Sequence, residues 1–458
     1  MTVKTNSVAR KGLLAMAWPI FIEQMLHVST GLIDTFMVSH VSDSAVAALG
    51  SANQFVILFI VLFGVVGIGS GVVVTHHLGA KDRAGADRLA ITAIVVNTWF
   101  GLLASVLVYW LAQPFLDLVQ LSPELQAYGL PFLTIMGATL FMEAMIQAIS
   151  SVLRAHGYAR DAMLVAVGQN VLNVVGNSIL LFGLFGAPKM GVVGVALSTV
   201  LSRVVACAAM WVLLSYRLHL RVRLQDYFDI SRERLGRILH IGLPAAAEHA
   251  SHFLAFMTIT AFTARMGDLQ LATQTYVMTI VWVIVLFSGA IGMATEIMIG
   301  HLVGAGEFEK VYKQTLRSLR VGLVTALMVA VIVAVASPWI LGVFTTNPAI
   351  ITTGVILLRI GIVLETGRVF NVVVIHGLRA TGDARYPVFF GVFSMWGVMA
   401  FGSWLLGTYF GLGLLGVWIA LTADEWLRGL MMYRRWKQRK WLKYAQRSHA
   451  HAVLPPMI

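Results

Sequence analysis

Polar side chains interrupt the first long apolar stretch of the sequence at a spacing that could support proton or cation chemistry. They follow one another at intervals of four, three and four residues, as Glu23, His27, Thr30 and Asp34. They therefore share one face of a helix. A carboxylate shielded from water has its charged form disfavoured and takes up a proton more readily. We single out Asp34 as an ion-coupling residue. The same face could instead offer oxygen ligands to Na⁺, or Asp34 could simply be hydrogen-bonded to a neighbour.

A second polar face occurs further along the chain, where Asn170, Asn173 and Asn177 are three and four residues apart. Amide side chains at this spacing could line a cavity opposite Asp34, and Glu23 is a further candidate for the same cavity. The alternative is that the three amides hydrogen-bond between helices and only hold them together. The sequence leaves both interpretations open.

The second half of the chain carries charged candidates of its own. Glu365 and Arg368 are three residues apart, which suits an internal ion pair with a structural or gating role. A charge at the centre of a membrane costs about 2.5–3.5 kcal/mol, so each ionisable residue in an apolar run is a functional candidate. The remaining candidates of this half are Glu248, His252 and Glu296.

The composition indicates which elements must position these residues. Of the 458 residues, 58% are hydrophobic and only 12% are charged, and the mean hydropathy is +0.82. Soluble proteins have about 25% charged residues, so a soluble enzyme or a nucleic-acid-binding protein is excluded despite the net charge of +12. The single cysteine, Cys207, excludes an intramolecular disulfide. No ATP-binding P-loop, zinc-binding H-E-x-x-H or nucleophile-elbow motif occurs, so we expect no enzymatic activity, no cofactor and no metal centre.

The apolar runs predict twelve transmembrane helices, since each crossing needs about 20 apolar residues. The runs are approximately 13–39, 51–79, 89–112, 127–152, 163–186, 191–216, 238–264, 271–303, 317–344, 348–377, 387–407 and 412–433. Lys and Arg gather at the N-terminus, in every second connection and in the C-terminal tail, which places both termini in the cytoplasm. We expect a monomeric multi-pass protein of a bacterial cell inner membrane, in contact with lipids and not with nucleic acid.

An internal repeat relates the two halves of the chain. The residues Pro19, Glu23 and His27 recur 225 positions later as Pro244, Glu248 and His252, and the same offset relates LRAHGYAR (153–160) to LRATGDAR (378–385). Six helices per copy insert with the same polarity, so the copies are parallel repeats, a class that places the substrate path between two bundles. The predicted organisation is an N-lobe (1–216), a basic cytoplasmic linker (217–237), a C-lobe (238–434) and a basic cytoplasmic tail (435–458).

The repeat also bears on the candidate residues. Asp34 maps onto Ile259, so only the first half carries this carboxylate. Arg368 maps onto Glu143, and these two side chains could face each other across the interface between the two bundles. Features shared by both halves are more easily explained as structural pairs one helical turn apart, namely Glu23–His27 and Glu248–His252.

Several segments resemble the multidrug and toxic compound extrusion (MATE) family. The segment WPIFIEQMLHVSTGLIDTFMVSHV (18–41) is similar to the family's first helix, with Pro19 at its bending proline and Asp34 at its coupling aspartate. Other similar segments are GIGSGVVVTHHLGAKD (67–82), LRAHGYAR (153–160), NVVGNSILLFGLFG (173–186), GVVGVALSTV (191–200) and LRATGDARYP (378–387). The resemblance covers about residues 10–440.

This resemblance implies an all-α polytopic fold of twelve transmembrane helices, arranged as two parallel six-helix repeats around a central V-shaped cavity. It also implies a secondary active antiporter that exports amphipathic, often cationic drugs in exchange for H⁺ or Na⁺ by alternating access. Asp34 would be the coupling residue, with Asn173 and Asn177 lining the N-lobe cavity. An alternative is a flippase for a lipid-linked amphiphile, which is disfavoured because the charges within the apolar runs are mainly acidic.

Two departures from the family pattern refine this expectation. Some DinF-type members carry aspartate where this chain has Asn177. The positions of the C-lobe carboxylates of NorM-type members are occupied here by His252 and Arg368. The first departure leaves Asp34 with fewer acidic neighbours. The second places the resemblance nearer to the DinF type than to the NorM type and favours coupling through the N-lobe, with H⁺ preferred over Na⁺.

Overall fold

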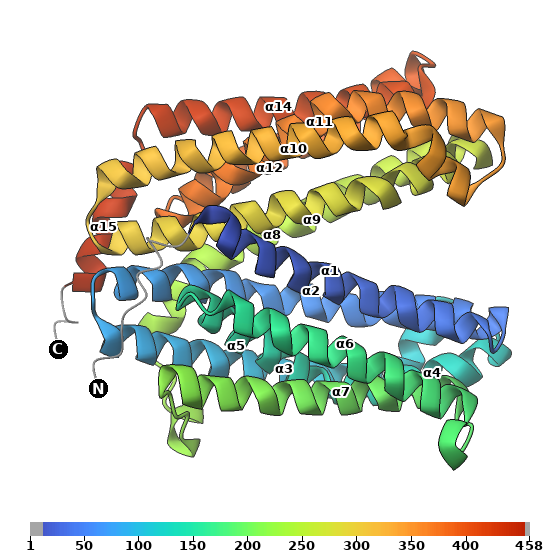
Figure 1. The fold of residues 1–458 in the computed structure, drawn as a ribbon, viewed down its shortest axis with the longest axis horizontal. Coiled ribbons are helices and arrows are strands. Elements are labelled where there is room, and N and C mark those ends of the chain that lie inside the picture. The colour runs from blue at the N-terminus through green and yellow to red at the C-terminus, as the bar shows by residue number, and fades with distance from the viewer. Residues whose placement is uncertain (1–11, 454–458) are drawn as a thin grey trace. The chain divides into compact units, whose positions relative to one another are not determined.

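The computed structural model describes residues 12–453, which fold into helices joined by short connections (Figure 1). The two chain ends, predicted to be cytoplasmic, lie outside the described residues. The first half contains α1 (Leu13–Ser39), α2 (Asp43–Gly79), α3 (Arg83–Leu118), α4 (Pro123–Ala138), α5 (Leu140–Ala155), α6 (Ala159–Phe182) and α7 (Gly191–Leu213). The second half contains α8 (Arg232–Arg265), α9 (Asp268–Gly304), α10 (Phe308–Phe344), α11 (Pro348–Ala380), α12 (Arg385–Ser394), α13 (Phe401–Ser403), α14 (Gly413–Lys437) and α15 (Leu442–Val453).

Each of the twelve predicted apolar runs coincides with helix. The fourth run is the bent pair α4 and α5, which turns by 47°. The eleventh run contains two π-helical segments, η5 (Met395–Ala400) and η6 (Trp404–Tyr409). By length and apolar composition, eight of the described helices could span a membrane, or nine if the bent pair forms one span. The runs outside this set are α1, α8 and α14, all of which contain charged side chains.

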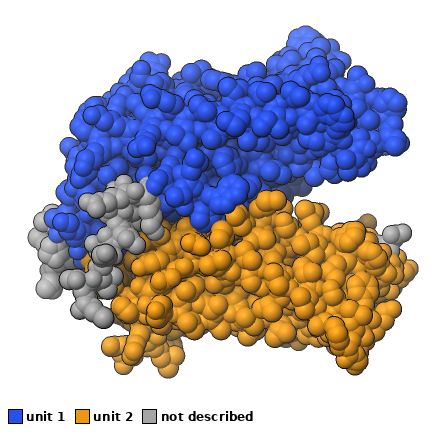
Figure 2. All heavy atoms as spheres, in the orientation of Figure 1, with its two compact units in different colours: residues 1–21, 75–82, 244–458 blue, residues 22–74, 83–243 orange. Residues whose placement is uncertain are grey.

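The chain forms two compact units (Figure 2), and these do not follow a simple cut between its halves. Unit 1 comprises residues 1–21, 75–82 and 244–458, and unit 2 comprises residues 22–74 and 83–243. The start of α1 thus belongs to unit 1, and the start of α8 belongs to unit 2. The two boundaries lie close to the repeat-related residues Pro19 and Pro244. Proline removes a hydrogen bond within a helix, so both helices change unit where they bend most easily. The lobe boundaries predicted from the sequence stay a prediction.

Glycines of the repeat mark the closest helix crossing within unit 1, where the ends of α2 and α9 meet. A Cβ atom added at Gly79 would overlap the backbone carbonyl of His301. A Cβ atom added at Gly304 would overlap the backbone carbonyl of His76. The two contacts are related by the 225-residue offset and are reciprocal, as expected for helices that are equivalent in a parallel repeat. Only glycine permits this approach of the two backbones.

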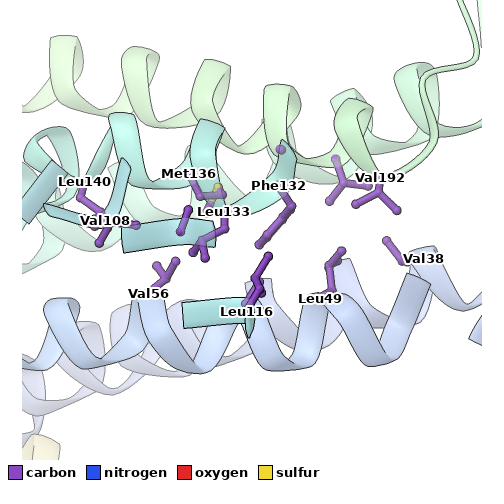
Figure 3. Packing of buried hydrophobic residues seen from close by; sticks show 14 of the residues in the cluster. Val38, Leu49, Val56, Val108, Leu116, Phe132, Leu133, Met136, Leu140 and Val192 are labelled. Atoms are coloured by element: carbon purple, nitrogen blue, oxygen red, sulfur yellow. The ribbon is translucent and has the colours of Figure 1, made fainter. Parts of the chain in front are cut away.

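Unit 2 has its own hydrophobic core where α2, α3, α4, α5 and α7 meet (Figure 3). These helices contribute, in that order, Val56, Val108, Leu133, Leu140 and Val192, all of which are buried. In a membrane these helices are held together by close van der Waals packing, because lipid is as apolar as the side chains themselves. In addition, α6 packs along α7. The core therefore fixes α7, and α7 in turn positions the asparagine face of α6.

Unit 1 has a separate core, in which α11 is the central helix because it packs against α9, α10 and α14. Its buried apolar residues include Ile259, Val277, Leu357, Val417 and Trp418. Glu365 and Arg368 of this helix face the protein interior. These two charged side chains must therefore find partners within the protein, on α11 itself or on the neighbouring helices.

Candidate ion-coupling site

Asp34 lies in the second half of α1, and only 8% of the residue is exposed. Its Oδ1 accepts a hydrogen bond of 2.6 Å from Nδ2 of Asn177 on α6. The same Nδ2 lies 3.4 Å from Oδ1 of Asn173, and Nδ2 of Asn173 donates to Oγ1 of Thr199 on α7 at 3.0 Å. The helices α1, α6 and α7 thus meet at one carboxylate through neutral hydrogen-bonding groups.

The asparagine face predicted from the sequence lies against α1, and its three members have different contacts. Asn173 and Asn177 connect to Asp34, whereas Oδ1 of Asn170 accepts a hydrogen bond of 2.8 Å from Oγ1 of Thr30. Among the described residues, Oδ1 of Asn177 has no hydrogen-bond partner. The cluster therefore offers an uncommitted acceptor oxygen next to the carboxylate. The prediction that these amides also line a cavity stays a prediction.

Among the described residues, Asp34 differs from the other buried carboxylates because no basic side chain forms an ion pair with it within 4.0 Å. In the part of the chain that the structure describes, each of the others lies within 4.0 Å of an arginine nitrogen. The pairs are Glu23–Arg154 (2.7 Å), Glu143–Arg203 (3.2 Å), Glu248–Arg379 (3.4 Å), Glu296–Arg379 (3.7 Å), Glu365–Arg368 (3.1 Å), Asp383–Arg435 (2.6 Å), Asp424–Arg428 (2.6 Å) and Glu425–Arg428 (3.2 Å). Burying an unpaired charge is costly, so Asp34 is the carboxylate best placed to bind a proton or a cation.

Glu143 and Arg368, which could face each other across the interface between the bundles, each have an ion-pair partner within their own unit. Glu143 on α5 pairs with Arg203 on α7, and both residues belong to unit 2 and are at most 5% exposed. Arg368 belongs to unit 1 and pairs there with Glu365. The sequence signal for Arg203 is a basic residue within an apolar run, which requires an acidic partner. The sequence does not show which carboxylate supplies it.

The partners of Glu23 and Glu248 are arginines, not the histidines one turn away. Oε1 of Glu23 accepts hydrogen bonds from Arg154 at 2.7 Å and from Ser150. Oε2 of Glu248 accepts one from Arg379 at 3.4 Å. The two pairs are equivalent because both glutamates and both arginines differ by 225 residues. This shared offset is the signal that identifies Arg154 and Arg379 as partners instead of loop charges.

The charged candidates of α11 form a buried network with α14. The predicted ion pair is confirmed, since Nε of Arg368 lies 3.2 and 3.1 Å from the two carboxylate oxygens of Glu365. Nη1 of Arg368 also lies 3.3 Å from Glu425 on α14, which accepts a hydrogen bond from Asn371 at 2.9 Å. Arg428 provides a second cation for Glu425. Each carboxylate here has an arginine, so the network can hold α11 against α14 without a bound ion.

The two remaining candidates, His252 and Glu296, have different neighbours. His252 on α8 is partly buried and close to Arg428 and Glu425. Glu296 on α9 is 8% exposed, and its Oε2 lies 3.7 Å from Arg379 and 3.8 Å from His376. The structure thus brings Glu296 to the same arginine that binds Glu248. These residues belong to unit 1, whereas Asp34 belongs to unit 2.

Two stretches of the chain match the protein-family model MatE, namely residues 19–179 and 244–405. The chain belongs to the MATE family. The two matches begin at the repeat-related residues Pro19 and Pro244, so the family model covers both copies of the repeat. A protein of this family is a membrane transporter and not an enzyme.

Known MATE proteins and related sequences align along most of this chain. The "Uncharacterized transporter YisQ" of Bacillus subtilis is 40% identical over 431 residues, which are 94% of this chain and 95% of that protein. The "Multidrug resistance protein PmpM" of Pseudomonas aeruginosa is 26% identical over 401 residues, 85% of this chain and 82% of that protein. A solved structure described as "Crystal structure of MATE in the bent conformation" has a TM-score of 0.89 at 22% identity, covering 98% of this chain and 100% of that chain. The predicted all-helical, multi-span fold is confirmed.

Proposed function

We propose that this MATE protein is a secondary active multidrug antiporter that exports amphipathic organic cations in exchange for H⁺. Asp34 is the coupling residue, and the coupling resides in the N-terminal half, as in DinF-type members. One observation carries the proposal. Asp34 is a buried carboxylate, held by the neutral amide of Asn177, with no basic partner among the described residues. Na⁺ is the alternative ion, since Asp34 and Oδ1 of Asn177 both offer oxygen.

The proton state of Asp34 determines its hydrogen bonds. The ionised carboxylate accepts the N–H of Asn177. A protonated carboxyl group has an O–H that must donate to an oxygen, and Oδ1 of Asn177 is available as acceptor. Proton uptake therefore changes the contact between α1 and α6, and it also removes the negative charge that would bind an organic cation. Because H⁺ and substrate compete for one charge, the binding of one releases the other.

Two observations favour export of drugs over the flipping of a lipid. The relative from Pseudomonas aeruginosa is named a multidrug resistance protein. A flippase for a pyrophosphate-linked lipid would need unpaired arginines to bind the phosphates. The buried arginines in the described chain are instead paired with carboxylates, as Arg203, Arg368, Arg379 and Arg428 show. We therefore prefer the antiporter to the flippase.

The test is efflux of a fluorescent organic cation from proteoliposomes, driven separately by a pH gradient and by a Na⁺ gradient. We expect the pH gradient to drive efflux by the wild type and not by Asp34→Asn, which retains the shape of the side chain without its charge. The matched control is Asp117→Asn, because Asp117 is exposed at the end of α3. Normal proton-driven efflux by Asp34→Asn would refute the proposal, and efflux driven only by Na⁺ would transfer the coupling to that ion.

A further inference from the structure

A second titratable pair occurs in unit 1, where the repeat has neutral residues in its first copy. Glu296 on α9 occupies the position of Gly71, and His376 on α11 occupies the position of Ser151. The helix contact around these two positions is otherwise the same in both copies of the repeat. Ser151 packs against α2, where its Oγ donates to the carbonyl of Gly67 at 2.6 Å, and the ring of His376 lies against the equivalent glycine, Gly292. The second copy has therefore gained two titratable groups in one place.

The hydrogen bonds of His376 determine which of its nitrogens faces Glu296. Nδ1 lies 2.8 Å from the backbone carbonyl of Val372. A carbonyl only accepts, so Nδ1 carries a hydrogen and donates it. In the neutral ring, Nε2 then presents a lone pair toward Oε2 of Glu296, 3.8 Å away. Two acceptors face each other unless a proton lies between them.

Glu296 has no other way to satisfy this oxygen. In the described chain its Oε2 is buried and has no hydrogen-bond partner. Arg379 approaches to 3.7 Å, which is too long for a hydrogen bond, and its guanidinium also binds Glu248. His249 on α8, an exposed residue, is a further titratable group near His376. A buried acceptor without a donor is unfavourable, and a proton on the carboxyl group removes the problem.

We propose that Glu296 and His376 form a proton-binding site in unit 1. Protonation of Glu296 turns one of the two facing acceptors into a donor, so the side chains close from 3.8 Å to hydrogen-bonding distance and the carboxyl O–H of Glu296 donates to Nε2 of His376. The bound proton neutralises Glu296, so Arg379 then forms an ion pair with Glu248 alone. In the first copy the equivalent arginine has one carboxylate and binds it at 2.7 Å, whereas Arg379 lies 3.4 Å from Glu248. Protonation of Glu296 therefore tightens the Glu248–Arg379 pair and with it the contact between α8 and α11.

The test is infrared difference spectroscopy of the full-length protein in lipid during a pH titration. A protonated carboxyl group gives a C=O stretching band, separate from the carboxylate bands, that shifts in D₂O. We expect one such band to be lost on raising the pH in the wild type and to be absent from Glu296→Gln. His376→Ser, which restores the residue of the first copy, should move the band to higher frequency because the acceptor of the O–H has become weaker. A pH-dependent spectrum of Glu296→Gln identical to that of the wild type would overturn the proposal.

Two controls separate this site from other carboxylates. Glu365→Gln removes a buried glutamate that is fully engaged by Arg368, so the band should persist. Asp34→Asn should also leave the Glu296 band in place, so the proposed site is tested even if Asp34 proves not to couple transport. If Glu296→Gln does not fold, as judged by thermal unfolding, Glu296→Asp keeps the proton-binding group and should displace the band. An undisplaced band in that variant contradicts the assignment.

Discussion

The buried ion pair between Glu143 and Arg203 allows the energetic reasoning to be tested quantitatively. Nε of Arg203 lies 3.2 Å from Oε2 of Glu143, and the two residues are 5% and 3% exposed. At an effective dielectric constant of about 20, the Coulomb attraction at this distance is about 5 kcal/mol. Neither Nε of Arg203 nor Oε1 of Glu143 makes a hydrogen bond within the described residues. The pair is therefore held by charge attraction with little help from hydrogen bonding.

Glu143→Gln leaves the guanidinium of Arg203 buried and uncompensated. Removing one partner of a buried pair costs about 3–5 kcal/mol, and we expect the lower end of this range because the hydrogen bonding is incomplete. Arg203→Met should cost a similar amount by leaving the carboxylate alone. The double variant Glu143→Gln with Arg203→Met removes both charges by the same two substitutions, so it should cost far less than the sum of the single changes.

The measurement is the free energy of unfolding in detergent micelles, followed by tryptophan fluorescence. The control is Asp161→Asn, which breaks the more exposed pair with Arg217 and should cost about 1 kcal/mol or less. If Glu143→Gln costs no more than this control, the buried charge is compensated by groups other than Glu143. Additive costs in the double variant would likewise refute a direct interaction.

Two further predictions concern helix packing and capping. Gly304→Ala should lower the free energy of unfolding by about 1–3 kcal/mol, because its Cβ would overlap the carbonyl of His76. The control Gly64→Ala adds a methyl group where no atom lies within 4 Å, so it should not destabilise the protein. Equal shifts of the thermal unfolding temperature for the two variants would contradict the close crossing. Asn347→Ala should lower the free energy of unfolding by about 1 kcal/mol, since Oδ1 of Asn347 accepts the N–H of Ala349 at 3.0 Å at the start of α11. An unchanged thermal unfolding temperature would show that water replaces this cap and would contradict the prediction.

The fold was predictable because the membrane restricts the possible structures. A chain with so few charges must satisfy its backbone within helices, so each apolar run becomes a helix. The repeat was also readable, because equivalent packing needs equivalent residues at an equal offset, as at Gly79 and Gly304. The bend at Thr139 and the π segments of the eleventh run were not predicted. They depend on how neighbouring helices pack and not on the local apolar pattern.

Some features of the candidate residues were likewise predictable from the sequence, and others were not. The sequence alone determined that Asp34 is a carboxylate in an apolar run without an equivalent in the second half, and that Asn173 and Asn177 share a helical face. Such statements follow from residue type and helical period. The sequence also predicted the Glu365–Arg368 pair, because residues three positions apart meet on one helix.

Only the tertiary structure decided which charges are paired across helices. Glu143 binds Arg203, Glu23 binds Arg154, and Asp34 binds neither of these arginines. The reason is physical: a pair within one helix is determined by the 3.6-residue period, whereas a pair between helices depends on how each helix is rotated and where it crosses its neighbour. The isolation of Asp34, on which the proposed coupling rests, is a property of all its neighbours together, so no single stretch of the sequence contains it.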